Sequence, residues 1–336
     1  MTVAPGVPGR QRAAGVALAI VAGFAAALQS RVNGSLATAV DNAFVAAFFS
    51  FSSGLVLLLL ALVASRTGRV AVRRVGSGLR SGALRPWECL GGLGGAFFVM
   101  SQGLTVDALG VAVFTVALVA GQSVSSLVID RLGIAPGGVR LVTLGRALGP
   151  VLTVVAVVVV SGAGASTAAL GLALFPLVAG VLQSFQQALN GRVRSAVRDP
   201  APAAPRPRLG GDGGVIAATL VSFVVGTAAL LVVMLVALAV GGAPTGGLPP
   251  DLLLYSGGLL GVTFIALQAA VVQRTGVLLL GLGMIAGQVV GALVLDVVSP
   301  GVAPPGTATY VGAALTLVAV AVPLVEGALR RRVRER

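Results

Sequence analysis

Amide side chains recur at matched places in the two halves of this 336-residue chain, with a spacing that suits contact with a polar solute. Gln29 and Asn33 are four residues apart, so a helix places both on one face. Gln186 and Asn190 repeat the pair at an offset of 157 residues (186 − 29). Such neutral amides can line a solute pathway, or they can bond across helices for about 0.6–2 kcal/mol each. Both interpretations stay open, because amides that only pack helices would be duplicated as well.

Four further glutamines lie deeper in apolar segments and also form matched pairs. An amide at membrane depth costs free energy unless it bonds to something. Eight duplicated amides therefore favour a wet central cavity. The predicted substrate-binding residues are Gln29, Asn33, Gln102, Gln122, Gln186, Asn190, Gln268 and Gln288.

The acidic residues stand near the ends of apolar segments and not at their centres. Asp130 and Asp296 close two matched segments, and they are the candidates for coupling transport to an ion. Ionisable groups inside the membrane are what proton relays use. The alternative is that both carboxylates only anchor helix ends. The chain has no His and one Cys, Cys89, so no metal site, no cofactor and no catalytic residue are expected.

Composition places these residues in a membrane protein. Hydrophobic residues make up 57% of the chain and charged residues 10%, whereas soluble domains carry about 25% charged residues. Apolar segments of about 20 residues are long enough to cross a hydrocarbon core of roughly 30 Å. We predict an all-α integral membrane protein with ten transmembrane helices. They lie near 13–38, 43–64, 88–105, 110–129, 141–161, 169–190, 214–240, 252–272, 276–296 and 308–327.

Four sequence blocks recur in the same order in both halves. Among them, SFxxG at 50–54 returns at 222–226, and AGQ at 120–122 returns at 286–288. A duplicated membrane bundle is typical of secondary transporters, which place their site where the repeats meet. Five helices per half make the second half enter the membrane from the opposite face, which gives inverted repeats.

The expected organisation has four parts. They are a cytoplasmic N-terminus (1–12), the first repeat (13–162), the second repeat (163–328, with a mobile cytoplasmic loop at 192–213) and a basic tail (329–336). The paired GxxxG motifs at 91–95 and 257–261 are expected to let helices approach closely.

The arginines orient the chain. Of the 23 basic residues, all arginine, only Arg31 falls outside if the N-terminus is cytoplasmic. Positively charged loops stay on the cytoplasmic side, so both termini are expected there. The formal net charge of +13 therefore reflects topology, and nucleic-acid binding is not expected.

The pattern of Gly23, Gln29-x-x-x-Asn33-Gly34, the SFxxG motif at 50–54 and Gly121-Gln122 before Asp130 resembles the YdcZ family. That family belongs to the drug/metabolite transporter superfamily, and the resemblance implies a fused chain of two five-helix, EamA-like halves. It also implies an exporter-like protein of the bacterial inner membrane. Small multidrug members of the superfamily couple to protons through a Glu on the first helix. The polar residues on that helix are here Gln29 and Asn33, a departure from proton-coupled multidrug export.

Taken together, these features predict a secondary transporter and not an enzyme. It would export a small polar or amphiphilic metabolite or drug by alternating access. A flippase for a lipid-linked substrate is the alternative within transport, and a membrane scaffold or assembly protein is the alternative outside it. The expected partners are a small-molecule substrate and the lipid bilayer, and association into a homodimer is left open.

Overall fold

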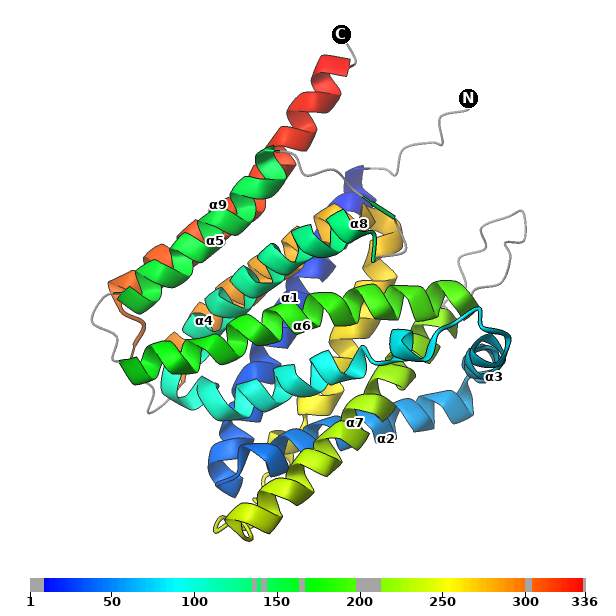
Figure 1. Ribbon diagram of the computed structural model, residues 1–336. Coiled ribbons are helices and arrows are strands. Elements are labelled where there is room, and N and C mark those ends of the chain that lie inside the picture. Colours follow the sequence, from blue (N-terminus) through cyan, green and yellow to red (C-terminus); the bar gives the residue numbers. More distant parts are fainter. Residues whose placement is uncertain are drawn as a thin grey trace.

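The structure is a computed structural model that describes residues 9–134, 138–139, 144–162, 167–197, 213–299 and 304–334, and these ranges are helices joined by turns (Figure 1). The first half contains α1 Gly9–Val40, α2 Ala43–Ala64, α3 Arg66–Ser81, the 3-10 helix η1 Pro86–Cys89, α4 Gly92–Leu132 and α5 Leu144–Gly162. The second half contains α6 Thr167–Val197, α7 Gly213–Gly241, the 3-10 helix η2 Leu252–Tyr255, α8 Gly257–Val298 and α9 Thr307–Arg334.

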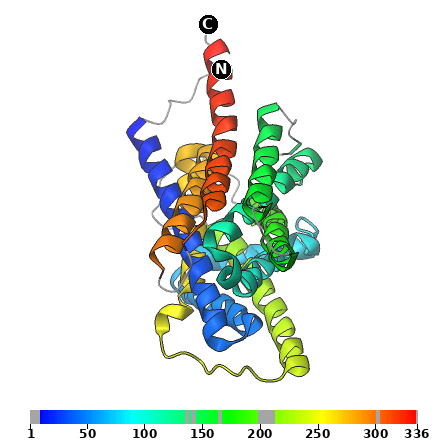
Figure 2. The ribbon, with the colours of Figure 1, turned by 90° about the vertical axis from the view of Figure 1, so that its left-hand side faces the viewer.

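Within the described residues, six helical segments are long and apolar enough to cross a membrane, and three shorter apolar segments accompany them. The protein is therefore an all-α membrane protein, as predicted. The start of α1 and the end of α9 lie at one end of the molecule, and the turn at 242–251 lies at the other (Figure 2).

α4 contains most of two predicted transmembrane segments, 88–105 and 110–129. Its backbone is broken between them, at Gly110. This residue has φ +78° and ψ 160°, a conformation that a glycine adopts without steric cost. The two stretches of α4 lie at an angle to each other in Figure 1. α8 Gly257–Val298 contains most of two further predicted segments, 252–272 and 276–296, in one helix.

The basic segment 65–86, which joins the predicted transmembrane helices 43–64 and 88–105, contains the amphipathic helix α3. Ser65 caps its start by accepting a hydrogen bond of 3.0 Å from the backbone N–H of Gly68. Ala71 and Val75 are buried against α6 and α7, whereas the arginines other than Arg74 are exposed. A segment with only one narrow apolar face has too low a mean hydropathy to be detected as a membrane helix.

The core is built from contacts that recur with the two halves exchanged. α1 packs mainly on α8, and α4 packs mainly on α6. A Cβ on Gly121 would overlap the carbonyl oxygen of Leu177, and a Cβ on Gly287 would overlap that of Ile20. These positions match at the offsets of the sequence repeats, 166 (287 − 121) and 157 (177 − 20).

The glycines of the two GxxxG motifs mostly face side chains of the other half, since a Cβ on Gly95 would meet the side chain of Gln186 and a Cβ on Gly261 that of Gln29. The neighbouring glycines take part in the close backbone packing: a Cβ on Gly92 would overlap the carbonyl oxygen of Ser222, and a Cβ on Gly258 would overlap that of Ser50. α5 and α9 form an outer antiparallel pair, since Gly149 lies near Ala319 whereas Gly312 lies near Val160 (Figure 1).

Candidate functional site

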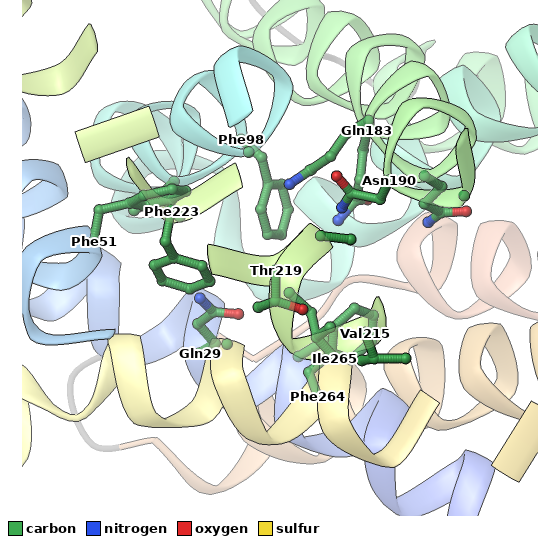
Figure 3. A pocket seen from close by; sticks show the side chains of 18 of the residues that line it. Gln29, Phe51, Phe98, Gln183, Asn190, Val215, Thr219, Phe223, Phe264 and Ile265 are labelled. Atoms are coloured by element: carbon green, nitrogen blue, oxygen red, sulfur yellow. The ribbon is translucent and has the colours of Figure 1, made fainter. Parts of the chain in front are cut away.

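A cavity of about 270 Å³ lies among α1, α2, α4, α6, α7 and α8 (Figure 3). Pockets for small molecules typically start near 300 Å³, so this space suits a small ligand. Its polar lining comprises Gln29, Gln183, Gln186, Gln187, Asn190, Arg194 and Thr219. Its larger apolar lining residues are Phe51, Phe98, Val99, Val215, Phe223, Phe264 and Ile265.

Gln29 and Gln186 approach the cavity in matched ways from opposite halves. The amide nitrogen of Gln29 would be 2.8 Å from a Cβ on Gly261, and that of Gln186 would be 2.7 Å from a Cβ on Gly95. Each glutamine thus uses the space that a glycine of the other half leaves. Among the described residues, no protein group hydrogen-bonds either amide, so both are available to a ligand.

Asn190 presents a donor group to the cavity. The Oγ of Ser222 donates a hydrogen bond of 2.6 Å to the Oδ1 of Asn190, which occupies the acceptor end of this amide. The Nδ2 group remains for a ligand. Figure 3 shows Asn190 and Gln183 on one side of the cavity and Gln29 on the other.

Asn33, the counterpart of Asn190, lies outside the cavity in a closed polar cluster. Its Nδ2 donates to the Oε1 of Gln102 at 2.6 Å, and the Nε2 of Gln102 donates to the Oγ of Ser30 at 2.8 Å. These three side chains are at most 3% exposed. The Oδ1 of Asn33 and the Oγ of Ser50, both buried beside Gly257, have no hydrogen-bond partner.

The remaining predicted amides have other surroundings. The Nε2 of Gln122 donates to the Oε1 of Gln183, so Gln122 contacts the lining from behind. Gln288 is 5% exposed and lies where α8 packs against Gly23. The side chain of Gln268 lies outside the described residues. Three of the eight predicted residues therefore line the cavity: Gln29, Gln186 and Asn190.

Aromatic rings form much of the lining, and the sequence reasoning did not single them out. The ring centroids of Phe51 and Phe223 are 4.9 Å apart, and each ring lies over a glycine of the other half, Gly226 and Gly54 respectively. A phenylalanine in an apolar segment looks like ordinary core. The available signal was the position of both rings in the duplicated SFxxG motif.

Asp296 anchors the second stretch of α4. Its carboxylate accepts hydrogen bonds from the backbone N–H groups of Val111 and Ala112, at 2.8 and 2.7 Å. The side chain is 4% exposed, and the break at Gly110 directs these N–H groups towards it. This geometry is that of a helix N-cap. Asp130 lies partly buried near the end of α4.

A charged contact at the arginine-rich end was also missed. Arg192 of α6 forms an ion pair of 2.8 Å with Glu88, and its guanidinium lies 5.6 Å from the ring centroid of Trp87. It also donates to the carbonyl oxygens of Gly133, at 3.3 Å, and Ile134. One side chain thus holds α6 to both ends of α4.

Six apolar segments of membrane-spanning length and an internal cavity define a multi-pass membrane protein. Residues 14–159 and 207–322 match the model of the family described as "Putative inner membrane exporter, YdcZ", and the chain belongs to this family. This confirms the resemblance seen in the sequence and places the protein in the inner membrane.

The other comparisons concern the fold alone. No curated protein matches the chain. A solved structure described as "Crystal structure of protein" is 20% identical, with a TM-score of 0.54. The alignment covers 94% of this chain and 98% of that chain, so the two share an overall fold.

Proposed function

We propose that this protein exports a small polar or amphiphilic metabolite or drug by alternating access. The observation that carries the proposal is the unequal state of two matched asparagines. Asn190 borders an open cavity, whereas Asn33 is buried and bonded to Gln102. A transporter that exposes its site to one side at a time needs such a difference between equivalent positions.

The two halves are proposed to be inverted repeats of five helices each, 13–162 and 163–328. The reciprocal glycine contacts of α1 with α8 and of α4 with α6 support this arrangement. The antiparallel packing of α5 on α9 supports it as well, because a two-fold axis in the membrane plane relates antiparallel helices.

The cavity is proposed to open to the cytoplasm. Arg194 and Gly191, near the end of α6, contribute to its lining, and α3 with its outward arginines packs beside the start of α7. Basic segments stay on the cytoplasmic side, so both termini would be cytoplasmic. The Asn33–Gln102–Ser30 cluster would then close the external side.

In the proposed cycle, a substrate enters from the cytoplasm and bonds to the free amides of Gln29 and Gln186. The halves then exchange states, so that the side of Asn190 closes and the side of Asn33 opens. A ligand that binds the inward-open and outward-open states equally tightly does not shift the equilibrium between them. The substrate must therefore bind most tightly to the arrangement between these two states.

The test combines transport with thiol labelling. Cys89 is the only cysteine, so Cys89→Ser provides a background for Asn190→Cys and Asn33→Cys. In inside-out vesicles, a membrane-impermeant maleimide should label the cysteine at 190 quickly and the cysteine at 33 slowly. A matched control is a cysteine in place of the buried Ala19.

The same protein in proteoliposomes should move at least one solute of a metabolite panel. Equal labelling rates of the cysteines at 33 and 190 from one side would contradict the proposed closure of the external side. Absence of movement across the panel would favour the scaffold alternative, and movement of a lipid-linked probe alone would favour the flippase.

A further inference from the structure

We propose, on the basis of the export function above, that the cavity takes an organic anion: a carboxylate head on an apolar body of about one ring. This assignment narrows the substrate class to acids and excludes organic cations. Four features of the described residues carry it: the charge of the lining, its unbonded polar groups, its aromatic rings, and the charge around its entrance.

The described lining residues carry positive and no negative charge. Among the described residues that border the cavity, Arg194 is the one charged side chain and none is acidic. A cation that leaves water for such a site loses hydration and gains no counter-charge, which costs several kcal/mol. The described carboxylates near the core have other tasks, since Glu88 pairs with Arg192 and Asp296 caps a helix.

The free polar groups favour an acceptor-rich ligand. The oxygen of Asn190 already accepts a hydrogen bond from Ser222, so the unbonded group of this side chain is its Nδ2 donor. Gln186 lies one helical turn before Asn190 and adds an unbonded amide from the same face. A carboxylate accepts about four hydrogen bonds and donates none, which matches this donor set.

The apolar body has a matching place. Phe51 and Phe223 stack at one side of the cavity, and Phe98 and Phe264 border it as well (Figure 3). A phenyl ring or a branched chain of similar size would pack against these rings by offset or edge contacts. The volume of about 270 Å³ leaves room for one such body and its head group.

The entrance of the cavity, near Gly191 and Arg194 at the end of α6, attracts anions. α6 carries Arg194 there, and α3 turns Arg66 and Arg73 outward nearby. One-signed charge around a cleft raises the local concentration and on-rate of oppositely charged ligands by about 10–10³-fold. Membrane topology explains arginines at this end, but it does not explain why none of the described lining residues is acidic.

The experiment compares three probes of one shape and different charge: 3-phenylpropionate, 3-phenylpropanamide and 3-phenylpropylammonium. Binding to the purified full-length protein is measured by isothermal titration calorimetry at low and high salt. The carboxylate should bind at least about tenfold more tightly than the ammonium probe, with the amide between them. Raising the salt from about 50 to 500 mM should weaken the carboxylate and leave the amide within twofold, because screening acts on charge.

Arg194→Gln should weaken carboxylate binding about three- to tenfold and leave amide binding within twofold. Arg80→Gln, an exposed arginine away from the lining, is the matched control and should change neither at high salt. Ammonium binding as tight as carboxylate binding, or no saturable binding of any probe, would overturn the proposal. Carboxylate binding without transport in proteoliposomes would instead contradict the export function and leave the ligand assignment standing.

Discussion

The amide nitrogen of Gln29 lies 2.8 Å from where a Cβ on Gly261 would stand. The matched pair in the other half, Gln186 and Gly95, has the same relationship at 2.7 Å. Each glycine therefore sets the position of a cavity-lining amide that comes from the opposite half. The positions of these amides therefore depend on contacts between the two halves, and neither half could form the site alone.

We expect Gly261→Ala to impair transport and leave folding nearly intact. The new methyl group meets the far end of a flexible side chain, which can rotate away at small cost, but the amide then leaves its place in the cavity. Transport in proteoliposomes should fall several-fold, with a melting temperature within a few degrees of wild type. Gly171→Ala on α6 is the control, because a Cβ there meets nothing within 4 Å. Unchanged transport in Gly261→Ala would contradict this role of the glycine.

Gly287→Ala should instead destabilise the protein. A Cβ at this position would overlap the backbone of Ile20, and backbone cannot move aside without separating α1 from α8. Overpacking of this kind costs typically about 1–3 kcal/mol. Thermal denaturation in detergent should show a clear drop in the midpoint. Gly281→Ala on the same helix has open space around its Cβ and should leave the midpoint unchanged or slightly raised. Equal midpoints for the two variants would disprove the close-packing interpretation.

Gln29→Ala and Gln186→Ala should reduce transport, with protein level and thermal stability close to wild type. Neither amide bonds to a described protein group, so its loss leaves no partner unsatisfied. Gln102→Ala should behave in the opposite way, because Gln102 is fully buried and bonded to Asn33 and Ser30. Leaving those partners unpaired costs about 1–3 kcal/mol. Early melting of the Gln29 and Gln186 variants would show that these amides pack helices and do not meet substrate.

The repeat pattern could be predicted from the sequence, but the different surroundings of the matched amides could not. Asn33 and Asn190 stand in matched local sequences, so nothing local separates them. Their different surroundings come from partners distant in the sequence, Gln102 for Asn33 and Ser222 for Asn190. A comparison of the local sequences cannot show which distant partner each asparagine takes.

Other features were missed for a different reason. The ion pair between Glu88 and Arg192 joins residues 104 positions apart and has no sequence signal. α3 is absent from the predicted helices because its arginines lower the mean hydropathy, although Ala71 and Val75 give it a buried face. The spacing of four residues singled out both Gln29 and Asn33, but only Gln29 of this pair lines the cavity.

Reporter fusions should give the orientation of the chain. A fusion after Arg85, which follows α3, should report a cytoplasmic location, and a fusion near Gly246 should report an external one. The basis is the concentration of arginines at the α3 end and the position of the 242–251 turn at the other end of the molecule (Figure 2). An external signal after Arg85 would contradict the proposed orientation and, with it, the cytoplasmic opening of the cavity.

Asp296 is expected to act as a helix anchor and not as a proton carrier. Its two oxygens are occupied by the backbone N–H groups of Val111 and Ala112, outside the residues that line the cavity. Asp296→Asn keeps one acceptor oxygen and should retain most transport, whereas Asp296→Ala loses the cap and should cost about 0.5–2 kcal/mol. Uptake into proteoliposomes under an imposed pH gradient, with Asp130→Asn as the matched variant, separates the two roles. If wild type accumulates substrate along the gradient and Asp296→Asn folds normally yet loses this accumulation, Asp296 couples transport to protons and the anchor interpretation fails.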